Sequence, residues 1–359
     1  MKKHLSKSDV ANACFFRTST RRPHRKALIQ ITEQCNLSCA HCFVDAKRKG
    51  SMLSIQSFSD NVLPLLLDAR VVSVSLTGGE PTAHPDISIF IELLSANSLD
   101  TTICTNGVFL PDELISLSRK LGRIKYNVSL DGFSEESHSK FRGVRNCFSR
   151  TVSNVRRLAD NNLLKGILVT PNKNAGADEY ENICSFAADV GAEFVLLNPL
   201  SSFGRGEKSR KKLEASQGMM RDIINLTAKF SDMIDVVYIR FPNDDRMLTA
   251  CEAGNIIYVF SSGDVTVCPY LVFAARTANS RHDPKEFIVG NVFCDNDLSA
   301  KLDSYNYANL NRAPKICGAC AKSNCGRGCP AAVVSGGLPL GELDTEMCPF
   351  SLVQGASLS

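Results

Sequence analysis

The residues with the clearest chemical meaning are three cysteines near the start of the chain, Cys35, Cys39 and Cys42, in the spacing C-x3-C-x2-C. Three thiolates can neither saturate a tetrahedral zinc ion nor complete a four-thiolate set. A cubane iron–sulfur cluster bound through three cysteines therefore keeps one iron open for a substrate or a cofactor. A zinc knuckle with His41 as the fourth ligand is the alternative interpretation of this motif.

A second set of cysteines lies in the last third of the chain and also indicates metal binding. Its members are Cys251, Cys268, Cys317, Cys320, Cys325, Cys329 and Cys348. One or two structural zinc ions are the alternative for cysteines at such spacings. The remaining cysteines are expected to be buried, apolar core thiols; they are Cys14, Cys104, Cys147, Cys184 and, with less weight, Cys294.

The elements that must position the first cysteines alternate between short β-type runs and amphipathic helical segments. The β-type runs cover residues 27–32, 71–76, 101–105, 125–130, 166–170 and 193–197. Six such units in series predict an α/β fold, a partial (β/α)6 TIM-like barrel, with functional residues at the C-terminal ends of the strands. The cysteine loop directly follows the first run.

Changes of pattern divide the 359 residues into four predicted regions. Residues 1–26 form a basic N-terminal arm, which we expect to be solvated, and residues 27–200 form the barrel core. Residues 201–234 form a linker with a bridging helix at 218–230, and we expect 201–216 to be a linker or mobile loop. Residues 235–359 form a small cysteine-rich α+β domain with a β-hairpin of residues 256–260 and 265–268.

Composition excludes several classes of protein. The net charge of +4 is too small to indicate nucleic acid as a partner. The sequence contains neither a membrane-spanning apolar stretch nor a signal peptide, so we predict a cytosolic protein with no membrane partner. In that reducing compartment 15 cysteines favour metal binding or thiol chemistry over disulfides.

Polar motifs stand at the expected C-terminal ends of the next three strands. In Gly78-Gly79-Glu80 the glycines allow close approach to a ligand, and Glu80 offers a carboxylate to an ammonium group. Asn106 follows the third strand, and Ser129 and Asp131 end the fourth. Arg142 lies further on, and its guanidinium suits a carboxylate. Ordinary turns, a helix cap at Asp131 and a surface salt bridge at Arg142 are the alternatives.

Together these motifs resemble the radical S-adenosylmethionine (SAM) superfamily over nearly the whole chain. The resemblance implies that Cys35, Cys39 and Cys42 hold a [4Fe–4S] cluster whose open iron binds SAM. An electron from the cluster would then cleave SAM to a 5′-deoxyadenosyl radical, which removes a hydrogen atom from the substrate. The cofactor contacts implied by position are Gly78, Gly79, Glu80, Asn106, Ser129, Asp131 and Arg142. Phe43 either packs near the cofactor, as aromatic residues beside this cysteine do in relatives, or is a core residue.

The order of the later cysteines resembles the SPASM extension, which implies two auxiliary [4Fe–4S] clusters. By position the nearer cluster takes Cys251, Cys268 and Cys329, and the outer one takes Cys317, Cys320, Cys325 and Cys348. The spacing from Cys320 to Cys325 is one residue shorter than the commonest pattern. The fourth position of the nearer cluster is either open to substrate or filled by a residue such as Cys294.

A SPASM extension most often accompanies the modification of peptides or protein side chains. We therefore predict an enzyme that cross-links, oxidises or epimerises a peptide residue, with a reductant protein such as flavodoxin or ferredoxin as partner. The alternative enzyme is a radical oxidoreductase acting on a small molecule, such as a tetrapyrrole, a sugar or an alcohol. The non-enzymatic alternative is an iron–sulfur or zinc binding module.

Overall fold

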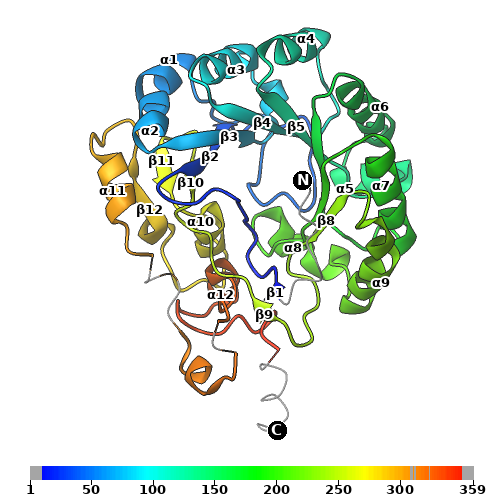
Figure 1. Ribbon diagram of the computed structural model, residues 1–359, viewed down its shortest axis with the longest axis vertical. Helices are drawn as coiled ribbons and strands as arrows, with labels where there is room; N and C mark the ends of the chain where they lie inside the picture. Colours follow the sequence, from blue (N-terminus) through cyan, green and yellow to red (C-terminus); the bar gives the residue numbers. More distant parts are fainter. Residues whose placement is uncertain (1–9, 308–309, 311–312, 323, 350–359) are drawn as a thin grey trace.

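The computed structural model describes residues 10–307, 310, 313–322 and 324–349. Its centre is a curved sheet of seven consecutive parallel strands, each hydrogen-bonded to the next (Figure 1). They are β2 (Arg25–Thr32), β3 (Val71–Gly78), β4 (Asp100–Thr105), β5 (Ile124–Ser129), β6 (Leu164–Val169), β7 (Phe194–Leu197) and β8 (Asp235–Tyr238). The predicted parallel α/β core is confirmed, with β8 as a strand that the sequence pattern did not indicate.

Helices cover the outer face of this sheet, as Figure 1 shows. They are α1 (Ile55–Ser57), α2 (Leu63–Asp68), α3 (Ile87–Ala96), α4 (Asp112–Leu121), α6 (Cys147–Asp160), α7 (Ala177–Asp189) and α9 (Gln217–Thr227). Apolar side chains of the strands, such as Ile29, Ile103 and Val195, are fully buried. Burial on both faces explains why these strands read as apolar runs in the sequence.

The predicted β-hairpin is present as β10 (Ile256–Val259) and β11 (Asp264–Thr266), which pair antiparallel and are followed by β12 (Ile288–Asn291). The hairpin extends the main sheet, because β10 pairs parallel with β2. Both edges of the barrel core therefore continue beyond residue 234, through β8 on one side and β10 on the other. The boundary that we expected at residue 235 falls inside the sheet.

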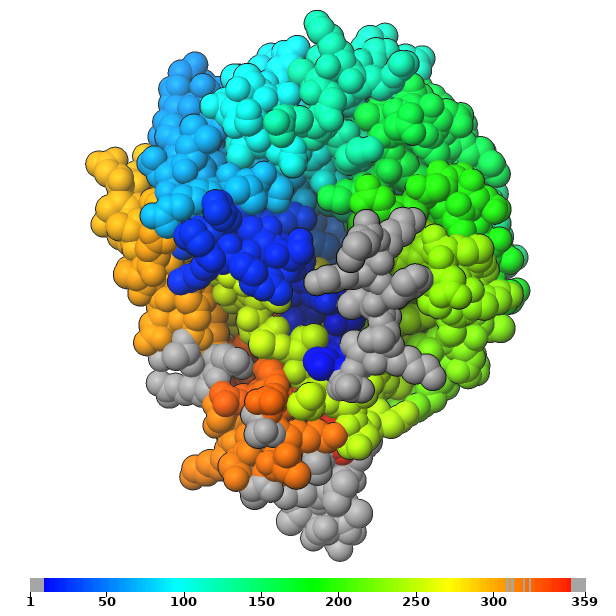
Figure 2. Space-filling model, viewed as in Figure 1, coloured from blue at the N-terminus to red at the C-terminus, as the bar shows by residue number. Residues whose placement is uncertain are grey.

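Two expectations about the flanking segments were wrong. Residues 201–216 contain the helix α8 (Arg205–Leu213), which has no apolar periodicity and so gave no helical signal. In the N-terminal arm, residues 1–9 lie outside the described residues, but β1 (Val10–Ala11) pairs parallel with β9 (Met247–Leu248). From residue 10 the arm is thus part of the packed structure, with Ala13 and Cys14 buried. In Figure 2 the dark-blue atoms of the arm lie against the yellow-green segment.

Short helices complete the C-terminal part: α10 (Pro269–Ala275), α11 (Leu298–Ser304) and α12 (Pro330–Ser335). The helices α10 and α12 pack against each other, and each begins directly after a candidate ligand, Cys268 and Cys329. Proline at the first position of both helices fixes where each one starts. Within the described ranges, no helix is both long and apolar enough to cross a bilayer.

Candidate active site and cluster sites

The loop of Cys35, Cys39 and Cys42 begins three residues after β2 and lies at the C-terminal end of the parallel sheet. Two backbone N–H groups donate to its sulfurs, from Leu37 to Cys35 Sγ at 3.3 Å and from Ala46 to Cys42 Sγ at 3.3 Å. Burial raises the pKa of Cys35 to about 11 and that of Cys39 to about 12. These thiols are therefore neutral without a metal, and a bound iron would hold them as thiolates.

Helix α8, which comes more than 150 residues later in the sequence, holds this loop in place through hydrogen bonds. The Arg205 side chain donates to the carbonyl oxygens of Cys39 at 2.8 Å and Ala46 at 2.6 Å, and its backbone N–H donates to that of Cys42 at 3.0 Å. Ser209 Oγ donates to the carbonyl of Ala40 at 2.8 Å. Arg205 and Ser209 are positioning residues that the sequence did not reveal, since their partners lie more than 150 positions earlier.

The Gly78-Gly79-Glu80 segment is hydrogen-bonded to the end of β2 and to the residues that follow it, directly before the cysteine loop. The N–H of Gly79 donates to the carbonyl of Thr32 at 2.8 Å, and the N–H of Glu80 donates to that of Gln34 at 2.8 Å. A Cβ added at Gly79 would lie 2.2 Å from the carbonyl oxygen of Gln34. These glycines therefore allow the segment after β3 to lie directly against the backbone of the segment after β2.

Gly79→Ala is expected to lower the free energy of unfolding by about 1–3 kcal/mol, because the added methyl group meets rigid backbone atoms. The measurement is the midpoint of urea unfolding. Gly218→Ala, in α9, is the matched control. A Cβ at Gly218 would meet only Ser216 Oγ, at 3.9 Å, and alanine favours the helical conformation at this position. Equal midpoints for the two variants would contradict the packing argument.

The Glu80 carboxylate is buried and accepts hydrogen bonds from the protein at both of its oxygens. Oε1 accepts hydrogen bonds from the Thr82 N–H at 3.1 Å, from Thr82 Oγ1 at 2.8 Å and from Thr105 Oγ1 at 2.7 Å, and Oε2 accepts one from the Asn106 N–H at 2.7 Å. Asn106 Nδ2 in turn donates to Asn36 Oδ1 of the cysteine loop at 2.8 Å. Glu80 and Asn106 thus tie the loops after β3 and β4 to the cysteine loop.

A buried charged pair lies in the segment after β5, where Asp131 follows the strand and Arg142 ends a short helix, Lys140–Arg142. Arg142 Nε lies 2.6 Å from Asp131 Oδ2, and the two side chains are 9% and 1% exposed. The contact is an ion pair without hydrogen-bond alignment, because neither atom has a hydrogen-bond partner among the described residues. Asp131 Oδ1 also accepts the N–H of Thr170 at 2.8 Å. Asp131 therefore connects the segments after β5 and β6, and Arg142 is not a surface residue.

His41 lies next to this pair, with its Nε2 3.8 Å from Asp131 Oδ2, and it packs face to face on Phe141 with ring centroids 4.1 Å apart. Burial lowers the pKa of His41 far below its usual value, and Arg142 and Arg205 lower it further, so the ring is neutral. Its Nδ1 is buried without a hydrogen-bond partner among the described residues, as is Oδ1 of Asn198 after β7. Two such polar atoms at the C-terminal end of the sheet suit a polar ligand there.

Phe43 and Ser129 have simpler surroundings. Phe43 stacks on Tyr270 of α10, with centroids 5.4 Å apart, and meets Phe273 edge-on at 5.5 Å. It therefore belongs to an aromatic contact between the cysteine loop and the C-terminal part of the chain. Ser129 is the half-buried last residue of β5 and stands next to the Asp131 segment.

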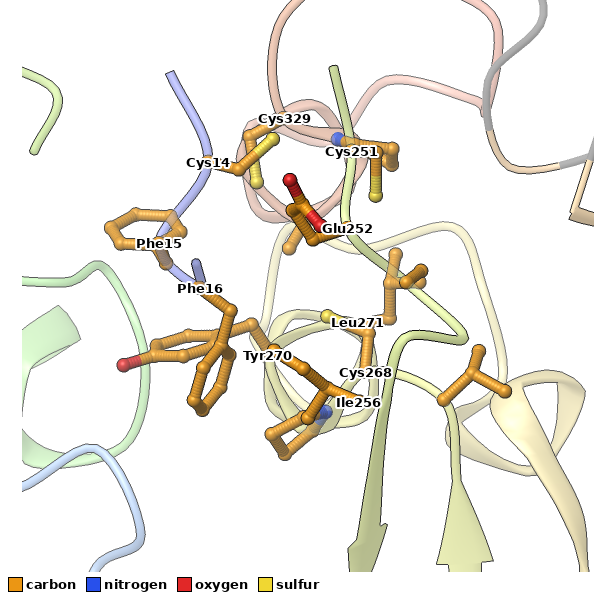
Figure 3. A pocket seen from close by; sticks show the side chains of 15 residues that line it. Cys14, Phe15, Phe16, Cys251, Glu252, Ile256, Cys268, Tyr270, Leu271 and Cys329 are labelled. Atoms are coloured by element: carbon orange, nitrogen blue, oxygen red, sulfur yellow. The ribbon is translucent and has the colours of Figure 1, made fainter. Parts of the chain in front are cut away.

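The later cysteines gather in two places. Cys251, Cys268 and Cys329 line one cavity of about 400 Å³, including its open mouth, and Cys14 lines it with them (Figure 3). The neighbouring Cys14 thiol lowers the pKa of Cys329 by hydrogen bonding to it. Elsewhere, burial raises the pKa of Cys317, and nearby Cys348, Cys325 and Cys320 raise it further. The structure thus brings together the three residues of the predicted nearer set, with Cys14 beside them, and it places Cys317 near the other three cysteines of the predicted outer set.

Cys294 does not join either group. Its side chain is exposed, and its Sγ lies 3.8 Å from the carbonyl oxygen of Asn291 on the turn after β12. In the described part of the chain no three His, Cys, Asp or Glu side chains converge where a single metal ion could sit. A cubane offers a separate iron to each thiolate, so its ligands surround a larger space than the ligands of one ion do.

The described chain is a parallel partial barrel with a three-cysteine loop at the C-terminal end of its first barrel strand, β2. This is the arrangement expected of a protein that binds an iron–sulfur cluster and a cofactor at the mouth of its barrel. Residues 29–186, which run from β2 through β6 and include most of the barrel core, match the family described as the Radical SAM superfamily. A match to this family implies a [4Fe–4S] cluster that binds SAM.

Two curated relatives and one solved structure extend the comparison. The antilisterial bacteriocin subtilosin biosynthesis protein AlbA of Bacillus subtilis is 26% identical over 75% of this chain, which spans 57% of AlbA. The mycofactocin maturase MftC of Mycobacterium tuberculosis is 26% identical over 88% of this chain and 81% of its own length. Streptococcus suis SuiB bound to precursor peptide SuiA superposes with a TM-score of 0.71 at 18% identity, covering 89% of this chain and 75% of SuiB, and thus shares the fold.

Proposed function

We propose that this chain is a radical SAM enzyme that modifies a side chain of a peptide or protein by cross-linking, oxidation or epimerisation. The observation that carries the proposal is the three-cysteine loop, held at the C-terminal end of β2 by the Gly79 and Glu80 backbone and by α8. The names of the relatives favour a peptide as substrate, since AlbA serves subtilosin biosynthesis, MftC is a maturase and SuiB was crystallised with a precursor peptide.

The residues at the barrel mouth fit a cluster and its cofactor. Cys35, Cys39 and Cys42 would hold a [4Fe–4S] cluster with one open iron. The unpartnered polar atoms of His41 and Asn198 and the buried Asp131–Arg142 pair offer polar contacts to SAM. When bound, the cluster and SAM would supply a 5′-deoxyadenosyl radical, formed with one electron, for removing a hydrogen atom from the substrate. A reductant protein such as flavodoxin or ferredoxin would supply that electron.

The chain's own residues would position and shield this chemistry. Glu80 and Asn106 fix the loops after β3 and β4 against the cysteine loop through hydrogen bonds that exclude water from the carboxylate. A series of stacked aromatic rings, Phe43, Tyr270 and Phe15, lies between the cysteine loop and the cavity lined by Cys251, Cys268 and Cys329. This apolar wall would keep water away from a reactive intermediate on that side. The two later cysteine groups would each hold an auxiliary [4Fe–4S] cluster.

The test uses the full chain, reconstituted with iron and sulfide without oxygen and reduced with dithionite in the presence of SAM. The candidate substrates are synthetic peptides encoded by short reading frames beside the gene. We expect 5′-deoxyadenosine together with a peptide whose mass changes, for example by loss of about two hydrogens for a cross-link. Turnover with a tetrapyrrole, sugar or alcohol and none with peptides would favour a small-molecule oxidoreductase. Zinc without iron would contradict radical chemistry altogether.

A further inference from the structure

The N-terminal segment brings a cysteine to the nearer group by strand pairing. In the parallel pair β1–β9, Val10 lies opposite Met247 and Ala11 opposite Leu248. The pairing continues past the strands, because the N–H of Ala13 donates to Thr249 Oγ1 at 3.1 Å. The Cys14 side chain therefore lies beside the segment that carries Cys251, with its Sγ near the carbonyl of Ala250.

The Cys14 thiol lies between two of the predicted ligands. Its Sγ is 3.9 Å from the carbonyl oxygen of Ala250 and 3.6 Å from that of Gly328, the residues directly before Cys251 and Cys329. Cys14 is 4% exposed. Figure 3 shows the side chains of Cys14, Cys251, Cys268 and Cys329 around one cavity, each arriving on a different segment of the chain.

Several contacts hold this segment in place on both sides of Cys14. Arg240 Nη1 donates to the carbonyl of Ala13 at 2.9 Å, and the Arg240 N–H donates to that of Asn12 at 2.7 Å. Arg240 is itself buried and paired with Asp344 at 2.6 Å. On the other side, Phe15 stacks on Tyr270 with ring centroids 4.9 Å apart. A thiol fixed in this way has the preorganisation that a metal ligand needs.

We propose that Cys14 is the fourth ligand of the nearer auxiliary cluster, with Cys251, Cys268 and Cys329 as the other three. This inference rests on the proposed function, because it takes the cluster to be present. Four thiolates complete the ligand set of a [4Fe–4S] cluster. The nearer cluster therefore has no open iron for substrate, and its part in the reaction is limited to carrying electrons. Cys294, exposed and outside the cavity, is not its ligand.

The test looks for an open iron in a protein that lacks the cluster of the cysteine loop. In the full chain, Cys35, Cys39 and Cys42 are replaced together by alanine, and ¹³C-cyanide is added to the reduced protein as a probe. With Cys14 intact we expect no ¹³C coupling in the electron-nuclear double resonance spectrum. Adding Cys14→Ala should open one iron, so that either ¹³C coupling appears or the chain loses about four of its iron atoms.

Cys294→Ala in the same background is the matched control and should change neither the iron content nor the spectrum. Cyanide binding while Cys14 is intact would overturn the assignment, as would a Cys14→Ala variant that matches the control in both its iron content and its spectrum. Circular dichroism of both variants shows whether the fold is retained. A native chain with iron and a triple variant with none would overturn the auxiliary cluster and the role of Cys14, while leaving the cluster of the cysteine loop standing.

Discussion

Replacing Cys39 by alanine is expected to lower the rate of 5′-deoxyadenosine formation by more than about 100-fold. Replacing residues that only hydrogen-bond to metal ligands already lowers activity roughly 10–100-fold, and loss of a ligand itself should lower it further. Cys39 is the buried member of the three-cysteine loop, 6% exposed, and its carbonyl anchors Arg205. Two remaining thiolates do not retain a cubane with a defined open iron. The measurement is 5′-deoxyadenosine by chromatography after dithionite reduction in the presence of SAM.

The matched control is Cys184→Ala, which removes a fully buried thiol from α7. This variant should keep both its iron content and its rate, since Cys184 lies in the helical layer outside the sheet. Iron analysis accompanies both proteins, and Cys39→Ala should lose about one cluster's worth of iron. Undiminished 5′-deoxyadenosine from Cys39→Ala would refute the role of the loop.

Asp131→Asn is expected to lower the free energy of unfolding by about 3–5 kcal/mol, because it leaves the buried Arg142 guanidinium without its counter-charge. The pair is separated by 2.6 Å and shielded from water. Asparagine keeps the shape of the side chain and can still accept the N–H of Thr170, so the substitution isolates the charge. The readout is the shift of the urea midpoint under anaerobic conditions.

Asp100→Asn provides the comparison, since Asp100 pairs with Arg123 at 2.8 Å but both side chains are exposed. Its loss should cost less than about 1 kcal/mol, because water already solvates and screens the two charges. A similar shift for both variants would mean that Asp131 and Arg142 are not a buried pair in solution. Loss of SAM binding by Asp131→Asn at an unchanged midpoint would instead place Asp131 in the cofactor site alone.

Local features of the chain were predictable from the sequence. Apolar runs alternating with amphipathic segments predicted the parallel core, because strands buried on both faces leave that pattern. The spacing of Cys35, Cys39 and Cys42 and the motif at Gly78 are also local, so their position after successive strands followed directly. The hairpin β10–β11 was readable from its turn, whereas its pairing with β2 was not.

Features that depend on distant partners were not predictable. Cys14 looked like a core thiol, because only the β1–β9 pairing brings it to Cys251, more than 200 positions later. The basic segment with Arg205 looked like a loop, since its helix is held by polar contacts to the cysteine loop. For Glu80 the sequence indicated a carboxylate but not its partners, which are Thr82, Thr105 and the Asn106 N–H.

The pairing of β10 with β2 also limits how the chain can be divided. A fragment that ends before residue 256 would contain the whole superfamily match at 29–186, yet it would leave β2 as an open edge. Unpaired N–H and C=O groups along such an edge recruit strands from other molecules. Copies of such a fragment would then aggregate through β2, the strand that precedes the cysteine loop. The core therefore cannot be excised as an independent module.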